Sequence, residues 1–190
     1  MLFRCKCALF LFDATRNDSF ILIKDFINII NISKYVYLKI ILVLNKSDLK
    51  NREITEVEIM EYMQSNKKID FIEITVKNSG NLEVLLNKTN NYLNQSILPV
   101  NLLSESLNKT ITNNFQALSF ILVGNSSVGK TCFLSRYFKN EYREFYYPTT
   151  GCDREIKYFK YYNNIYKCYL WDAAGAVRFR DLPKKVLSKC

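Results

Sequence analysis

The chain has 190 residues, of which 48% are hydrophobic, which is enough for one domain with a sizeable core and a connector. Its net charge of +9 comes from scattered lysines and arginines, a pattern typical of solvated surface and not of a nucleic-acid interface. There is no histidine, so any catalysis would depend on positioning, Mg²⁺ and backbone donors instead of the usual general base. The six cysteines lack the spacing of a zinc or disulfide framework, and no apolar run approaches the length of a membrane span.

Strands and helices alternate in the predicted secondary structure. From the N-terminus, strands are expected at Cys7–Phe12, Ile40–Leu44 and Phe71–Thr75, and helices at Ser19–Ile32, Thr55–Ser65 and Leu82–Leu93. Thr55 and Glu58 predict a capping box at the start of the second helix. Residues 96–116 contain Ser, Asn, Thr and isolated leucines, and predict a linker.

Beyond the linker the alternation continues. Strands are expected at Ser119–Val123, Glu155–Tyr161 and Tyr166–Trp171, with a helix at Lys130–Lys139. A turn at Tyr162-Asn163-Asn164 would join the last two strands as a hairpin. We therefore predict an α/β fold with a mostly parallel, six-stranded sheet and helices on both faces.

The tetrapeptide Asn45-Lys46-Ser47-Asp48 follows the predicted strand Ile40–Leu44. The Asp48 carboxylate offers a pair of acceptors that suits the N1–H and the exocyclic amine of guanine. Adenine has an acceptor at N1 and no amine at C2, so this residue would select GTP over ATP. Taken alone, the tetrapeptide also fits a turn followed by a helix cap.

The sequence GNSSVGKT at Gly124–Thr131 predicts a loop that cradles phosphates, with a buried strand before it and a helix after it. Gly124 and Gly129 let the backbone N–H groups turn toward the phosphates. Lys130 would reach the β- and γ-phosphates, and the Thr131 hydroxyl would ligate Mg²⁺. The predicted nucleotide contacts of this segment are Gly124, Asn125, Ser126, Ser127, Val128, Gly129, Lys130, Thr131 and Cys132.

Two further segments come after the phosphate loop. In Tyr147-Pro148-Thr149-Thr150-Gly151, the Thr149 hydroxyl would reach Mg²⁺ and its N–H the γ-phosphate. A later strand brings Asp172 to hold Mg²⁺ through water and the Gly175 N–H near the γ-phosphate. A Pro-Thr-Thr-Gly segment by itself is an ordinary turn. The predicted metal ligands are Thr131, Thr149 and Asp172, and the predicted catalytic residues are Lys130, Thr149 and Gly175.

This set of motifs resembles Rab-type small GTPases of the Ras superfamily, which have a P-loop NTPase fold. WDAAGAVRFR, which begins at Trp171, resembles the family's WDTAGQERFR, and residues 120–180 resemble the first half of the domain. Residues 7–13, 39–48 and 71–77 resemble three segments of its second half, the last of them the E-T-S-A-K segment that backs the base. The resemblance implies the cofactors GTP or GDP and Mg²⁺, and as partners effectors, exchange factors and activating proteins.

Residues around the base can be assigned in the same way. Asn45 would tie the base loop to the phosphate loop. The stem of Lys46 would pack over one face of the guanine, and Tyr142, by resemblance, would cover the other face. The predicted contacts in the segment that backs the base are Thr75, Val76 and Lys77, with the Val76 N–H donating to the guanine oxygen.

The order of the motifs is unusual, because the base-recognition residues precede the phosphate loop in the chain. Residues 1–95 are predicted to be the second half of a Rab-like domain, residues 96–116 the linker, and residues 117–190 the first half. Two explanations remain open. One is a circularly permuted GTPase domain, and the other is a slice through two tandem Rab-like domains.

Two classes of function follow. The first is a GTP-binding switch that hydrolyses GTP slowly, with a role in vesicle traffic by resemblance. The second is an interaction module without turnover, or a non-functional fragment of a tandem GTPase. Ala176 stands where the family has the glutamine that orients the attacking water, and Val177 replaces the adjacent glutamate. We expect a cytoplasmic location and leave peripheral attachment to endomembranes open, because Ser188-Lys189-Cys190 matches no standard prenylation motif.

Overall fold

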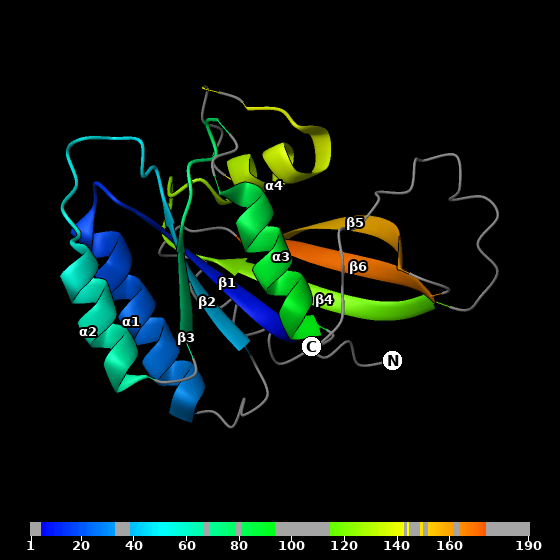
Figure 1. Ribbon diagram of the computed structural model, residues 1–190, viewed down its shortest axis with the longest axis horizontal. Coiled ribbons are helices and arrows are strands. Elements are labelled where there is room, and N and C mark those ends of the chain that lie inside the picture. Colours follow the sequence, from blue (N-terminus) through cyan, green and yellow to red (C-terminus); the bar gives the residue numbers. More distant parts are fainter. Residues whose placement is uncertain are drawn as a thin grey trace.

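The computed structural model describes residues 5–32, 39–66, 69–78, 81–93, 115–142, 144, 149, 152–161 and 164–173. These residues form a six-stranded sheet with helices packed against it (Figure 1). The strands are β1 (Cys5–Asp13), β2 (Lys39–Asn45), β3 (Ile69–Glu73), β4 (Phe115–Val123), β5 (Cys152–Tyr161) and β6 (Asn164–Ala173). The helices are α1 (Asn17–Ile32), α2 (Glu56–Ser65), α3 (Leu82–Leu93) and α4 (Lys130–Lys139).

The order of the strands across the sheet is β3-β2-β1-β4-β6-β5. All neighbouring pairs are parallel except β5 and β6, which form an antiparallel hairpin at one edge. The predicted α/β fold with a mostly parallel six-stranded sheet is therefore confirmed. Strand β1 pairs directly with β4, so the N-terminal and C-terminal parts of the chain share one sheet.

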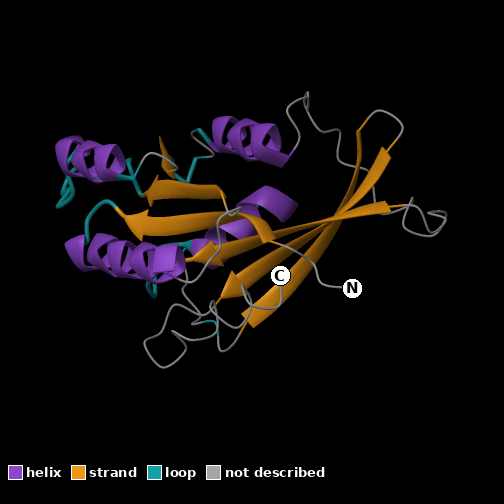
Figure 2. Cartoon of the chain, turned by 90° about the horizontal axis from the view of Figure 1, so that it is seen from below, coloured by secondary structure: helices purple, strands orange, loops and turns teal. Residues whose placement is uncertain are grey.

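Both faces of the sheet are covered by apolar side chains, and Figure 2 shows the twisted sheet with helices on more than one side. Successive side chains of β1 point to opposite faces, as they must in a strand. On one face, Leu11 lies in a core that includes Phe133 of α4 and residues of α3. On the other face, Phe12 lies in a core with Phe20 of α1 and Ile59 of α2. This double burial explains why the parallel strands are almost continuously hydrophobic.

The predicted elements are all present, and the differences lie at their ends. Helices α3 and α4 have the predicted bounds, whereas α2 begins at Glu56 because Thr55 is its N-cap, with the expected capping box. Strand β4 begins at Phe115, inside the predicted linker, because it pairs with β6 from that residue onward. Asn164 was expected in the hairpin turn but is the first residue of β6, and residues 162–163 lie outside the described part.

Strand β3 is also shifted toward the N-terminus. It covers Ile69–Glu73, because its pairing with β2 starts at Ile69 and ends at Glu73. Thr75, predicted as its last residue, instead is an isolated bridge residue just before a turn, and its hydroxyl donates to Asn78 Oδ1 at 3.3 Å. Within the described ranges, none of the helices combines the length and the hydropathy needed to span a membrane.

Candidate functional site

The candidate site lies at the edge of the sheet where β1, β2, β4 and β6 end. These four strands run in the same direction, so the residues at their carboxyl ends meet at one edge. In open α/β sheets this edge is the usual place for a ligand. Asp13, Asn45, Gly124 and Asp172 stand at these four strand ends, although they are far apart in the sequence.

The phosphate loop needs glycine at two positions because other parts of the protein approach it closely. A Cβ atom on Gly124 would collide with the carbonyl oxygen of Leu11 in β1. A Cβ on Gly129 would collide with the side-chain amide of Asn45. Gly129 also has a φ angle of +97°, which favours glycine. Both glycines therefore allow the loop to pack against strands from the N-terminal part of the chain. The loop leads directly into α4, as in phosphate-binding loops.

Lys130, the first residue of α4, is 7% exposed. Its Nζ donates to the carbonyl oxygen of Gly124 at 3.0 Å and to that of Asn125 at 2.7 Å, so the side chain lies across the phosphate loop. Burial lowers the pKa of the Lys130 ammonium to about 8, and the charge of Asp172 opposes this shift. A buried ammonium held by two neutral carbonyls is suited to an anionic ligand at the loop.

Thr131, Thr149 and Asp172 place three oxygen-bearing side chains together. The Thr131 hydroxyl donates to Asp172 Oδ2 at 2.6 Å, and its oxygen lies 3.0 Å from the Thr149 hydroxyl oxygen. Asp172 Oδ1 is buried and has no hydrogen-bond partner among the described residues. Burial raises the pKa of Asp172, and the hydrogen bond from Thr131 and the charge of Lys130 act in the opposite direction. A carboxylate oxygen without a hydrogen-bond partner and two nearby hydroxyls are hard oxygen ligands, the kind that Mg²⁺ prefers.

Asn45 links the phosphate loop to the segment that follows β3. Its Nδ2 donates to the carbonyl oxygen of Val128 at 2.8 Å, and its Oδ1 accepts from the Val76 N–H at 3.3 Å. The side chain is buried, so both bonds are shielded from water. The Ser47 hydroxyl donates to the backbone carbonyl oxygen of Ile74, just after β3, at 2.9 Å. This bond is a second link between the loop after β2 and the segment after β3. Asp48 follows on this loop and is exposed.

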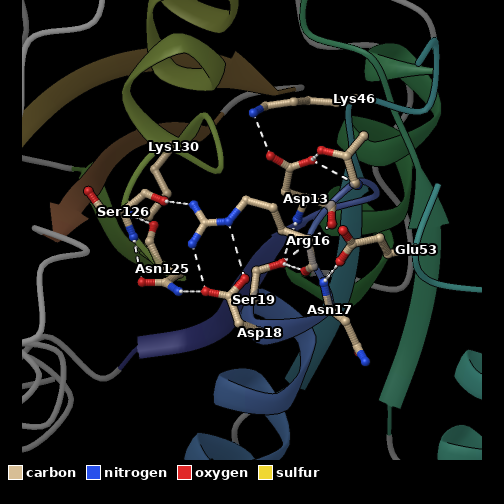
Figure 3. Close-up of polar contacts among 11 residues, drawn as sticks. Asp13, Arg16, Asn17, Asp18, Ser19, Lys46, Glu53, Asn125, Ser126 and Lys130 are labelled. Carbon is tan, nitrogen blue, oxygen red and sulfur yellow. Dashed lines mark hydrogen bonds and ion pairs between the residues drawn. The ribbon is translucent and has the colours of Figure 1, made fainter. Parts of the chain in front are cut away.

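Lys46 makes an ion pair that the sequence patterns do not predict. Its Nζ donates to Asp13 Oδ2 at 2.5 Å, and the contact is visible in Figure 3. Asp13 is fully buried, and its Oδ1 accepts from both the N–H and the hydroxyl of Thr15. The pair fixes the direction of the Lys46 side chain. A carboxylate at the end of a buried strand was the only sequence signal for Asp13.

Arg136 is a second residue that sequence analysis missed. On α4, its Nε donates to the carbonyl oxygen of Val76 at 3.0 Å and its Nη2 to that of Lys77 at 2.8 Å. These bonds hold the segment after β3 against the helix that follows the phosphate loop. The Arg136 guanidinium also lies 6.0 Å from the centre of the Tyr142 ring, and Tyr142 is 39% exposed. An exposed ring at this position is available to a flat ligand.

Some predicted site residues lie elsewhere or outside the described part. Cys132 is half-buried on α4, where burial raises the pKa of its thiol. Gly175, Ala176 and Val177 lie outside the described residues, as do the neighbours of Thr149 in its segment. The structure thus brings together residues of the phosphate loop, the oxygen cluster and the base loop.

Comparison with known proteins identifies the family. The Ras family model matches residues 1–95 and 119–190, which is most of the chain. The chain belongs to the Ras family. Curated relatives of this Ras-family chain are Rab and Ypt proteins. The GTP-binding protein YPTM1 of Zea mays is 38% identical over 73 residues, which cover 38% of this chain and 35% of YPTM1.

Two other relatives match over similar lengths. The GTP-binding protein ypt1 of Schizosaccharomyces pombe is 40% identical over 62 residues, covering 33% of this chain and 30% of ypt1. The human Ras-related protein Rab-34 is 38% identical over 72 residues, covering 38% of this chain and 28% of Rab-34. The chain therefore spans about a third of the length of these relatives.

Among solved structures, the crystal structure of GTP-bound wild-type EhRabX3 from Entamoeba histolytica aligns with 96% of this Ras-family chain and 54% of its own chain. The alignment has 19% sequence identity and a TM-score of 0.40.

Proposed function

We propose that this Ras-family chain binds GTP and GDP and acts as a nucleotide-dependent switch. The observation that carries the proposal is the position of Asn45, whose amide contacts both the phosphate loop and the segment predicted to back the base. A single ligand with a base at one end and phosphates at the other would span these elements. The exposed Asp48 carboxylate would select guanine, and the buried Lys130 would contact the phosphates.

A magnesium ion would be held by Thr131, Thr149 and Asp172, and it would neutralise charge on the phosphate oxygens when bound. Lys130 would add a second positive charge at the loop. The N–H groups of Thr149 and Gly175 would orient the terminal phosphate. No side chain is assigned as general base, because hydrolysis in this class depends on positioning and electrostatics.

The two parts of the chain would complete one nucleotide site in a permuted order, with residues 96–116 as the linker. This part of the proposal is supported by the direct pairing of β1 with β4 and by the bond from Asn45 to Val128. A slice through two tandem Rab-like domains remains the competing explanation. In that case each part of this chain would pack against a different half-domain in the full protein.

The binding of labelled GTP, GDP and ATP to the purified chain tests the proposal. We expect both guanine nucleotides to bind in the presence of Mg²⁺ and to be released faster after EDTA is added. Equal affinity for ATP and GTP would rule out the assigned base site. GTP that binds but is never hydrolysed would favour the interaction module over the switch.

Ala176→Gln is expected to speed hydrolysis of bound GTP by about one to two decades, because an alanine cannot orient a water in line with the γ-phosphate. The affinity for GTP should change little. Single-turnover assays measure the rate, and Val177→Glu serves as the neighbouring control. If the unmodified chain is already as fast as the glutamine variant, another group positions the water.

In a permuted domain, the purified chain with bound GDP is expected to be a monomer. Each part alone would leave the edge of β1 or β4 unpaired and an apolar face uncovered, so neither part should fold by itself. Size-exclusion chromatography with light scattering measures the mass over a range of concentrations. A dimer or aggregate at every concentration would instead support the slice through tandem domains, in which the two parts evolved to pack against other half-domains.

A further inference from the structure

Two residues outside the nucleotide-binding motifs, Arg16 in the turn after β1 and Asp18 in the first turn of α1, contact the phosphate loop (Figure 3). The Nη1 atom of Arg16 donates to the backbone carbonyl oxygen of Ser126 at 3.2 Å. The Nε and Nη2 atoms of the same guanidinium donate to the two oxygens of Asp18 at 3.1 and 2.7 Å. Arg16 therefore presents its planar fork to Asp18 and its remaining nitrogen to the loop.

Asp18 and Asn125 close this set of contacts into a ring. Asp18 Oδ2 also accepts from Asn125 Nδ2 at 3.2 Å, and Asn125 Oδ1 accepts from the Ser126 N–H at 2.9 Å. The ring thus passes from Arg16 to Ser126, to Asn125, to Asp18 and back to Arg16. It joins two segments separated by more than a hundred residues, and it grips both the carbonyl and the N–H of Ser126.

We propose that Arg16 is a positioning residue for the phosphate loop. A loop that binds phosphates must keep its carbonyl oxygens turned away from the ligand, because a carbonyl oxygen would repel the phosphate. The bond from Arg16 holds the Ser126 carbonyl on the side of the β1–α1 turn. The bidentate pair with Asp18 fixes the direction of the guanidinium, which a lysine could not reproduce.

The exposure of these groups decides which property should change when the ring is broken. The side chain of Arg16 is 38% exposed and that of Asp18 is 59% exposed, so the pair contributes little to folding stability. The single bond to Ser126 is the contact that reaches the ligand site. Its loss should therefore increase nucleotide release and leave the melting temperature of the nucleotide-free chain nearly unchanged.

The inference rests on the proposed function for its ligand, so its test has one readout with nucleotide and one without. With fluorescent GDP and GTP, Arg16→Ala is expected to raise both release rates about tenfold, as the loss of one charge-assisted hydrogen bond predicts. Arg16→Lys should resemble Arg16→Ala, and Asp18→Asn should raise both rates less. Lys39→Ala is the control, because its ion pair with Asp70 lies at the opposite end of β2.

Without nucleotide, hydrogen exchange of residues 124–129 is expected to be faster in Arg16→Ala than in the unmodified chain, with exchange in α2 unchanged. This measurement decides the role of Arg16 even if the chain binds no nucleotide. The absence of nucleotide binding would contradict the proposed function but not the role of Arg16 in the loop. Unchanged exchange of the loop would show that Arg16 and Asp18 are only a surface ion pair. An effect restricted to GTP release or to GTP hydrolysis would also overturn the inference, because it would place Arg16 on the terminal phosphate.

Discussion

Lys130→Ala is expected to lower the affinity for GTP by at least about 100-fold, because hydrogen bonds to charged groups contribute about 1.5–3 kcal/mol each and Lys130 would make them to the β- and γ-phosphates. For GDP, which has no γ-phosphate, the loss should be about tenfold. The expectation rests on the position of Nζ, which lies across the phosphate loop on two carbonyl oxygens. Titrations with fluorescent GTP and with fluorescent GDP in the presence of Mg²⁺ measure the two losses.

Loss of folding must be separated from loss of binding in this experiment. Lys130→Met keeps the apolar stem and removes a charge that is unfavourable in a buried position, but the carbonyls of Gly124 and Asn125 lose their donor. These effects oppose each other, so the melting temperature of the nucleotide-free protein should change little. The increase in melting temperature on adding GTP should disappear in this variant. Lys139→Ala, at the exposed end of the same helix, is the matched control and should bind normally. Normal binding by Lys130→Met would remove Lys130 from the site.

Asp48→Ala is expected to lower the affinity for GTP by about 100-fold, because the carboxylate would accept two hydrogen bonds from guanine, each of at least about 1.5 kcal/mol. Affinity for ATP should stay at its low level, so the selectivity between the two nucleotides should collapse. Inosine triphosphate keeps the N1–H and lacks the amine, so the unmodified chain should bind it less tightly than GTP. Competition against fluorescent GDP measures all three nucleotides.

The matched control for this prediction is Asp25→Ala, which removes an exposed carboxylate from α1. It tests whether a change in net charge alone alters the binding of an anionic ligand. If Asp25→Ala and Asp48→Ala lower the affinity for GTP equally, the effect is electrostatic and the assignment of Asp48 to the base is wrong. An Asp48 variant that still prefers GTP to inosine triphosphate would lead to the same conclusion.

Local sequence patterns were sufficient for most of the fold. Continuous apolar runs predicted the buried parallel strands, and the capping box of Thr55 and Glu58 located the start of α2. The errors are at strand ends, such as Phe115 in β4 and Thr75 after β3, because strand length depends on the neighbouring strand and not on local propensity. The two glycines of the phosphate loop were also predictable, since few other residues allow such close packing.

Contacts between distant segments could not be read from the chain. The bonds of Arg16 to Ser126, of Lys46 to Asp13 and of Arg136 to Val76 each join residues that only the order of the strands brings together. The sequence by itself determined the secondary structure, the glycine-rich loop and the family, because these depend on residues close together along the chain. The tertiary structure decided that β1 lies beside β4, and hence which polar side chains meet at the carboxyl ends of the strands, because pairing depends on the packing of the whole sheet.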